Sequence, residues 1–488
     1  MPAASPTLPD LSQLDAWDRR HAWHPFTQSA EAALYPPLQI QSGEGPWLFD
    51  IEGRKYFDGN SSLWTNVHGH RDPDLDAALR AQIEQVAHAT WLGLSHPLAA
   101  TLAAKLAQLG GPKLTRVFFT DNGSCAVEVA LKLSRQFWQL TGQPDKREIV
   151  GFTGGYHGDT LGAMAAGDGE AFHGRFADWF LPTHHVPAPH CRELAGKFLV
   201  ADSAASLRDL RELLGSRSKH IAAVILEPSV QGAAGMQHQP PGFVADVAAL
   251  CHEHGVHLIL DEVFVAFGRL GKMVVSRSEG VTPDFLCVGK GLTGGYLPLA
   301  ATLTSDEIHD AFRGTFEQGR TFYHGHTFTA NPLACAVALA SIEKLEPLVA
   351  SGTLEKRIAA FGKIFAENFS GHPQVSAPRQ RGFTAAIDLV ADAPNLKPYP
   401  ASARIALQVC LEARRRGVIL RPLGDSLLLV PPPCCEESDF RFLGENARAA
   451  VDTVVNRSGG PHLRFADFAS SYNPHPLPSE YDPTPPAS

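Results

Sequence analysis

The sequence predicts an α/β fold, in which a mainly parallel sheet covered by helices is followed by a smaller α+β domain. Largely apolar runs at 221–226, 256–260 and 285–288 have the length of strands that are buried on both faces. Segments 125–140 and 242–254 lie between such runs and have apolar residues at helical spacing. Buried strands that alternate with helices are typical of a parallel sheet with helices on both sides.

The composition indicates an ordinary globular protein. The chain has 488 residues, of which 44% are hydrophobic and 19% are charged, and its net charge of −9 argues against nucleic acid as the main partner. The N-terminal segment MPAASPTLPDLSQLD resembles no secretory signal, and no apolar stretch has transmembrane length. We therefore expect a cytoplasmic protein without a membrane partner. The eight cysteines are scattered and form no C-x-x-C motif, which favours reduced thiols.

The chain divides into four predicted parts. Residues 1–75 form an arm and a strand ribbon that packs with the small domain, and residues 1–20 of this part are expected to be a loose arm. Residues 76–335 contain the alternating strands and helices of the large domain. Residues 336–458 mix helices with short strands and form the smaller α+β domain. Residues 459–488 are rich in Pro and Ser and are expected to be an extended tail.

Four features each follow a strand of the predicted sheet: Gly123-Ser124, Tyr156, Asp261 and Lys290. The carboxyl ends of parallel strands meet at one edge, and sheets of this kind bind ligands there. Each feature has a structural alternative when it is taken alone. Ser124 could be an ordinary helix cap, Tyr156 a core residue, and Lys290 a surface lysine in a loop.

Together these residue types suit pyridoxal 5′-phosphate (PLP). A helix that begins at Gly123 presents free backbone N–H groups to a phosphate, and Tyr156 can lie against a planar ring. The desolvated carboxylate of Asp261 seeks a cationic partner, which the protonated pyridine nitrogen supplies. Lys290, at the mouth of a buried sheet, can lose its proton and act as a nucleophile. A nucleotide hydrolase would need G-x-x-x-x-G-K-[ST], and the chain has no such motif.

Longer motifs surround these positions, at 67–70, 154–160, 289–295 and 324–328. On these motifs the sequence resembles the class III, fold-type I PLP-dependent aminotransferases from about residue 23 to residue 455. Within that class it is similar to the 7,8-diaminononanoate synthases of biotin biosynthesis. This closer similarity rests on three motifs, which are Trp23-His24-Pro25, the run Tyr156-His157-Gly158-Asp159-Thr160 and the pair Arg421-Pro422.

The resemblance implies a role for each residue at the edge of the sheet. Lys290 would hold the cofactor and move the substrate proton, and Asp261 would pair with the pyridine nitrogen. Gly123 and Ser124 would bind the phosphate. Tyr156 would stack on the ring and border the substrate.

The resemblance also implies a substrate-binding region, in an active site that two subunits share. Gly325 and Trp64 would line it, and Arg421 would hold the carboxylate of 8-amino-7-oxononanoate, a task suited to a forked guanidinium. The alternative for Arg421 is a surface ion pair. His326 and Thr327 would reach the phosphate of the neighbouring subunit, so the expected active unit is a homodimer.

Two positions depart from the pattern of many adenosylmethionine-using members, which have Tyr where this chain has Phe26 and Trp where it has Leu63. Members that resemble a lysine-using subgroup have Phe and an aliphatic residue there. Both positions are expected to face the substrates, and the amino donor is expected to be S-adenosyl-L-methionine or L-lysine. The alternative function is that of another class III ω-aminotransferase, which would act on ornithine, 4-aminobutyrate or β-alanine.

One cluster has residue types that bind metals, namely Cys251, His252, His254 and His257. These residues span a predicted helix end and strand start, so their side chains would not face one point. No metal site is expected.

Overall fold

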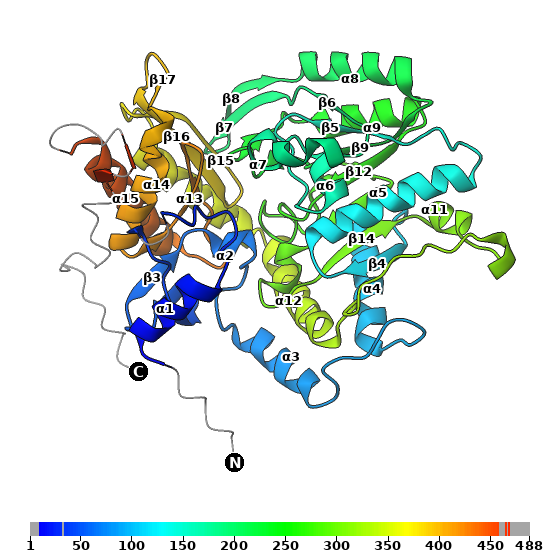
Figure 1. Cartoon of the computed structure of the whole chain (residues 1–488), viewed down its shortest axis with the longest axis horizontal. Coiled ribbons are helices and arrows are strands. Elements are labelled where there is room, and N and C mark those ends of the chain that lie inside the picture. The colour runs from blue at the N-terminus through cyan, green and yellow to red at the C-terminus, as the bar shows by residue number, and fades with distance from the viewer. Residues whose placement is uncertain (1–8, 32–33, 458–463, 466, 469–488) are drawn as a thin grey trace.

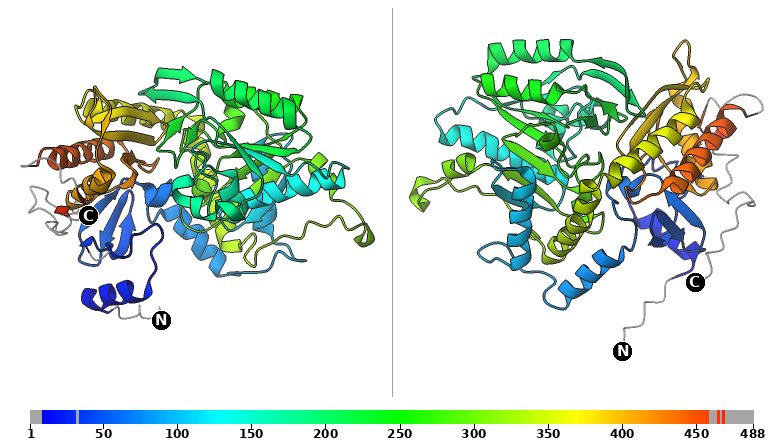
Figure 2. Two further views of the ribbon diagram at one scale, coloured as in Figure 1. Left: turned by 45° about the horizontal axis from the view of Figure 1, so that its top comes forward. Right: turned by 180° about the vertical axis from the view of Figure 1, so that it is seen from behind.

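The computed structural model describes residues 9–31, 34–457, 464–465 and 467–468. The central part of the chain, coloured cyan to green, forms one side of the molecule (Figure 1). The N-terminal part in blue and the C-terminal part in orange lie together on the other side, and the two views of Figure 2 agree. None of the helices in the described ranges is long and apolar enough to cross a membrane.

The central part contains a seven-stranded sheet. Its strands, in spatial order, are β4 (Arg116–Thr120), β14 (Ala300–Thr304), β13 (Phe285–Val288), β12 (His257–Asp261), β9 (Ile221–Leu226), β5 (Glu148–Phe152) and β6 (Thr183–Val186). All neighbours pair in parallel except β14, which is antiparallel to both β13 and β4. The prediction of an α/β fold with a mainly parallel sheet is confirmed.

Helices cover both faces of this sheet, because successive strand residues point to opposite sides. Ile259 of β12 packs with α5 (Gly123–Leu140). The next residue along, Leu260, belongs to the opposite core with α4 (Pro97–Gly110) and α9 (Phe243–Glu253). All residues of β9, β12 and β13 are therefore buried.

The C-terminal side contains a second, antiparallel sheet. It consists of β15 (Val375–Arg381), β16 (Thr384–Asp392), β20 (Ser426–Leu429) and β19 (Arg421–Leu423), with β17 (Lys397–Pro398) paired to β16. Its helices are α13 (Thr353–Phe369), α14 (Ile405–Arg415) and α15 (Glu437–Val455). The long helix α12 (Pro332–Ala350) leads into this part and contacts α3, α4 and α13.

The N-terminal ribbon shares a sheet with the C-terminal side. Its strands β1 (Ile40–Glu44), β2 (Trp47–Asp50) and β3 (Lys55–Asp58) are antiparallel, and β18 (Val418–Ile419) joins β3 in parallel. Trp47 packs on Phe442 of α15 with ring centroids 5.2 Å apart.

The remaining helices and strands lie between these parts in the chain, and only α3 and α8 among them are longer than six residues. They are α2 (Ser61–Trp64), α3 (Pro73–Ile83), α6 (Leu161–Ala166), α7 (Glu170–His173), η2 (Gly174–Trp179), β7 (His190–Leu194), β8 (Lys197–Asp202), α8 (Ala204–Arg217), β10 (Val230–Gln231), β11 (Gln237–His238), α10 (Val275–Ser278), η3 (Lys290–Thr293), α11 (Asp306–Ala311), η4 (Phe316–Gln318) and η5 (Ala401–Ala403). Strands β10, β11, β7 and β8 form a small sheet of their own.

The expectation of a loose arm over residues 1–20 is wrong for its second half, which forms helix α1 (Leu11–His21). The Asp10 side chain caps the helix by accepting a hydrogen bond from the backbone N–H of Gln13 at 2.9 Å. Basic side chains occupy its last turn, where they interact favourably with the helix dipole. Helix α1 is polar on average and buries none of its residues, so no buried face marks it as part of the core. Residues 1–8 lie outside the described residues.

Most of the predicted tail at 459–488 also lies outside the described residues. Two of its described side chains, Phe465 and Phe468, are buried beside Tyr35 and Leu407. The expectation of an extended tail does not hold at these two positions, since aromatic side chains three residues apart can share one apolar surface.

Candidate active site

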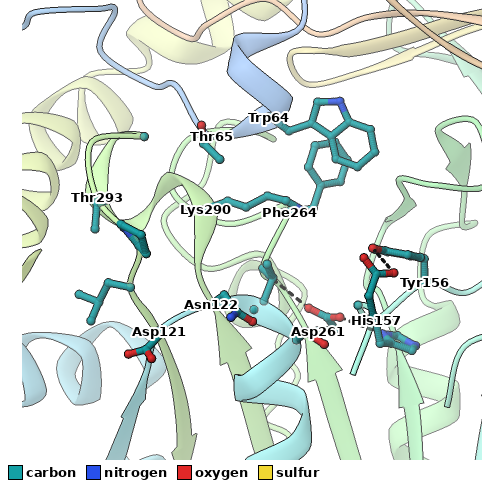
Figure 3. Close-up of a pocket in the computed structure, with 18 of the residues that line it drawn as sticks. Trp64, Thr65, Asp121, Asn122, Tyr156, His157, Asp261, Phe264, Lys290 and Thr293 are labelled. Carbon is teal, nitrogen blue, oxygen red and sulfur yellow. Dashed lines mark hydrogen bonds and ion pairs between the residues drawn. The ribbon is translucent and has the colours of Figure 1, made fainter. Parts of the chain in front are cut away.

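A cavity of about 670 Å³ opens beyond the carboxyl ends of the large sheet's strands (Figure 3). Lys290 follows β13, and Asp261 is the last residue of β12. Tyr156 follows β5, and Gly123 and Ser124 begin α5 after β4. All five residues line this one cavity, together with Trp64. The edge of the sheet therefore brings together residues that are up to 167 positions apart between Gly123 and Lys290.

Lys290 is in a strained and desolvated position. Its φ of 41° lies in the left-handed region, which is uncommon for a residue with a side chain. Its Nζ lies 5.1 Å from the ring centroid of Trp64 and 5.5 Å from that of Phe264. Burial lowers the pKa of Lys290, although the carboxylates of Asp261 and Glu227 oppose this effect. Within the described residues Nζ makes no hydrogen bond, so the amine is free to react.

Both oxygens of the Asp261 carboxylate are held in place. Oδ2 lies 2.8 Å from Nδ1 of His157, and Oδ1 accepts a hydrogen bond from the backbone N–H of Val263 at 3.1 Å. Figure 3 shows the His157 ring beside Asp261. Asp261 is only 5% exposed, so a cation in the cavity would interact with its carboxylate in a poorly solvated environment. The sequence motif includes His157, but its role as the partner of Asp261 was not foreseen.

Glu227 is a second site residue to which the sequence assigned no role. It directly follows the buried strand β9 and accepts hydrogen bonds from the backbone N–H groups of Tyr156 at 3.1 Å and Gly232 at 2.9 Å. Burial raises the pKa of Glu227 to about 7. The Glu227 carboxyl group thereby links the loop that contains Tyr156 to the end of β9 at the cavity. The signal that could have found it is a carboxylate placed directly after a wholly apolar strand.

One end of the cavity offers an anion site at the N-terminus of α5. The Asn122 side chain caps this helix by accepting from the backbone N–H of Cys125 at 3.0 Å. The backbone N–H groups of Gly123 and Ser124 have no acceptor within the described chain, and the helix dipole favours a negative charge there. A Cβ on Gly123 would lie 2.4 Å from the Val263 side chain, so only glycine fits against that loop. The Ser124 hydroxyl lies 2.7 Å from that of Thr160.

These residues fit PLP. The N-terminus of α5 suits its phosphate, the carboxylate of Asp261 suits its protonated ring nitrogen, and the free amine of Lys290 suits its aldehyde carbon. The aromatic ring of Tyr156 lines the same cavity. Its hydroxyl donates a hydrogen bond to Oδ1 of Asp159 at 3.0 Å, and burial raises the pKa of Tyr156.

A second cavity, of about 710 Å³, holds Phe26 and Arg421. The Arg421 guanidinium carbon lies 5.8 Å from the ring centroid of Phe26. Phe172 also lines this second cavity, and its neighbour His173 stacks on Tyr156 of the first cavity with ring centroids 5.8 Å apart, so the two cavities are adjacent. No carboxylate among the described residues forms an ion pair with Arg421, which disfavours the alternative of a surface ion pair.

Four predicted site residues line neither cavity. Leu63 is 46% exposed and has a left-handed φ of 65°. Gly325 and Thr327 are exposed, and Nδ1 of His326 lies 3.7 Å from Oδ2 of Asp121. The single chain does not bring these residues to Lys290, and their predicted roles stay predictions.

The cysteine and histidine cluster near residue 254 has other contacts. The His257 ring stacks on Trp138 with centroids 4.3 Å apart, and its Nδ1 lies 2.8 Å from the Ser134 hydroxyl. No group of three potential metal ligands occurs in the part of the chain that the structure describes.

The chain that carries this site is similar to a known family over most of its length. The family model described as aminotransferase class III matches residues 28–445. The chain is a class III aminotransferase. It has the fold-type I architecture, its cofactor is pyridoxal 5′-phosphate, and its reaction is a transamination.

Relatives of this aminotransferase share nearly its whole length. An adenosylmethionine-8-amino-7-oxononanoate aminotransferase of Geobacter sulfurreducens is 43% identical over 451 residues, which are 91% of this chain and 99% of that one. The crystal structure of the enzyme with the same name from Methanocaldococcus jannaschii has a TM-score of 0.86 at 36% identity, and the match covers 91% of this chain and 99% of that one. A PLP-bound amine transaminase from an uncultivated Pseudomonas species has a TM-score of 0.79 at 33% identity and covers 88% and 98%.

Proposed function

We propose that this aminotransferase transfers an amino group to 8-amino-7-oxononanoate and forms 7,8-diaminononanoate. The observation that carries the proposal is Arg421, a cation without an ion pair among the described residues, in the cavity next to that of Lys290. The carboxylate of 8-amino-7-oxononanoate is several carbons away from its keto group. The keto group would therefore lie in the cavity of Lys290 while the carboxylate binds Arg421 in the second cavity. The printed names of the relatives, which include this substrate, support the same acceptor.

The residues of the site would act in sequence on a bound substrate. PLP supplies an electron sink that weakens the C–H bond at the amine carbon. Nζ of Lys290 would take that proton from the substrate carbon and deliver it to the cofactor, since Lys290 is the one lysine among the described residues that line the cavity and its pKa is lowered. Asp261 would stabilise a positive charge on the ring nitrogen of PLP, and His157 holds the Asp261 carboxylate in place. Trp64 and Phe264 keep water away from Nζ.

For the amino donor, we propose L-lysine over S-adenosyl-L-methionine. The support is Phe26, which presents a hydrocarbon ring, without a hydroxyl, to the cavity of Arg421. The names of the relatives give adenosylmethionine as the donor of those enzymes, so both donors are compared directly.

The test measures single-turnover loss of the PLP absorbance with each donor, followed by formation of 7,8-diaminononanoate from the ketone. We expect the product with lysine and PLP. Conversion of the ketone with adenosylmethionine but not with lysine would contradict the lysine hypothesis. It would still support 8-amino-7-oxononanoate as the acceptor. Failure to convert 8-amino-7-oxononanoate with either donor, together with turnover of ornithine, 4-aminobutyrate or β-alanine, would replace the proposal with a general ω-aminotransferase.

We further propose that the enzyme acts as a homodimer with shared sites. The supporting observation is the segment around Thr327, which does not reach the cavity of its own chain. The His88 and Phe328 rings lie 4.7 Å apart, so the segment 316–328, which contains Thr327, contacts the segment 88–94. These two segments carry large apolar side chains that are more than half exposed, as expected for an interface. They are Leu92, Leu94, Phe316, Tyr323 and Phe328.

Hybrid dimers test the sharing of sites. Lys290→Ala inactivates its own site, and Thr327→Glu should repel the phosphate in the partner's site. A hybrid of the two variants, purified through two different tags, keeps one intact site if Thr327 acts across the interface. It should show about half of the wild-type activity. A hybrid of wild type with Lys290→Ala is the control. An inactive double-variant hybrid would place Thr327 in its own subunit and contradict the proposal.

A further inference from the structure

His173 holds two residues of the active-site cavity without lining the cavity itself. Oδ1 of Asp159 lies 2.9 Å from Nε2 of His173 and accepts a hydrogen bond from the Tyr156 hydroxyl at 3.0 Å. The His173 ring also stacks on the Tyr156 ring, with centroids 5.8 Å apart and planes 23° apart. His173 is 4% exposed, whereas the Asp159 side chain is 53% exposed. A buried imidazole thus fixes a carboxylate that faces solvent.

The neighbour of His173 reaches the second cavity. Phe172 precedes it at the end of α7 and meets the Phe26 ring edge-on, with centroids 5.9 Å apart. Phe26 in turn lies under the Arg421 guanidinium at 5.8 Å. Residues 172–173 therefore stand between the cavity that holds Tyr156 and the cavity that holds Arg421.

The room for His173 depends on Gly169. A Cβ at position 169 would lie 2.7 Å from Nδ1 of His173, closer than real Cβ contacts allow. The Gly169 backbone is not in the left-handed region, so alanine fits the local conformation. Gly169→Ala would displace the imidazole and leave its chemistry unchanged. Nδ1 is buried without a partner among the described residues, so Nε2 makes the bond that positions the ring.

We propose that His173 is a positioning residue for transamination. By donating to Asp159 and stacking on Tyr156, it sets where the Tyr156 ring lies relative to the substrate that extends toward Arg421. The inference rests on the proposed roles of Tyr156 and Arg421. A mispositioned Tyr156 ring would raise the barrier for the ketone substrate, because small shifts of a positioning group lower the population of reactive geometries.

The test compares three variants of the PLP-loaded enzyme. His173→Phe keeps a ring but loses the donor to Asp159, and we expect kcat/KM for the ketone to fall about tenfold, the effect of one hydrogen bond to a charged group. His173→Gln keeps a donor at the position of Nε2 and should recover part of this loss. Gly169→Ala, which moves the ring, should lower kcat/KM about threefold or more. The exposed positions His190→Phe and Gly215→Ala are matched controls and should match the wild type.

Two readouts separate positioning from folding. The visible circular dichroism of bound PLP should change in His173→Phe and Gly169→Ala, and KM for the ketone should rise more than KM for the donor. If kcat/KM stays within about twofold of the wild type in both variants, the proposal is overturned. The proposal is also overturned if the variants that lose kcat/KM have lower melting temperatures while the dichroism of bound PLP is unchanged. If His173→Phe does not fold, Gly169→Ala decides by the same criteria.

Failure of this inference can be told apart from failure of the proposed acceptor. The variants are compared with whichever keto acid the wild-type enzyme converts. A wild type that ignores 8-amino-7-oxononanoate but shows the expected losses with another keto acid would refute the acceptor and support His173.

Discussion

Replacing Lys290 with alanine is expected to abolish turnover. Lys290 supplies the free amine of the cavity and, in the proposed mechanism, the group that moves the substrate proton. Loss of a general base alone lowers rates by about a hundredfold to ten-thousandfold, and here the nucleophile is lost with it. The measurement is product formation over hours by mass spectrometry. We expect at least about a ten-thousandfold decrease.

Lys363→Ala is the control, since the Lys363 side chain is 76% exposed on α13. It should retain wild-type activity. Borohydride reduction of the yellow wild-type protein should attach the cofactor to the peptide that contains Lys290. Attachment to another lysine, or substantial activity in Lys290→Ala, would refute the assignment.

Asp261→Asn is expected to cause the second largest loss. Its carboxylate is the buried negative charge that faces the ring nitrogen of PLP in the proposed site, and an amide has no such charge. The change also weakens the interaction with His157, which lies 2.8 Å from the carboxylate. Removal of one preorganised charged partner from a poorly solvated site lowers kcat by about a hundredfold to a thousandfold. Steady-state kinetics with saturating PLP measure the loss.

Asp246→Asn, at an exposed position of α9, is the matched control for this carboxylate. The absorbance spectrum of bound PLP should differ between Asp261→Asn and wild type, because the ring nitrogen loses its anionic partner. Activity within about threefold of wild type would show that Asp261 does not act on the ring nitrogen.

Much of the site could be predicted because local sequence patterns indicate where its residues lie. Lys290 and Asp261 each end an apolar run, and such runs become buried strands through hydrophobic patterning alone. Once the strands are parallel, their carboxyl ends must meet at one edge. The sequence therefore indicated the cavity through Gly123, Tyr156, Asp261 and Lys290 before any pairing of strands was known.

Other features depended on contacts between segments that are distant in the chain. His157 and Glu227 were visible in the sequence, but the partner of His157 is 104 residues away and that of Glu227 is 71 residues away. The contact of His173 with Asp159 and Tyr156 depends on how the chain returns to residues 156–159 after α6. No local pattern encodes which polar side chains meet in this way.

The sequence by itself determined the fold class, the strand ends that carry Asp261 and Lys290, and the match to a phosphate-bearing planar cofactor. It could do so because strand burial and helix termini depend on neighbouring residues. Only the tertiary structure decided the antiparallel course of β14, the helix at 11–21, and the separation of the cavities of Lys290 and Arg421. The tertiary structure also places Leu63 and the segment 325–327 outside both cavities. Which side chains line a cavity depends on packing between segments that are distant in the chain, so local patterns could not predict it.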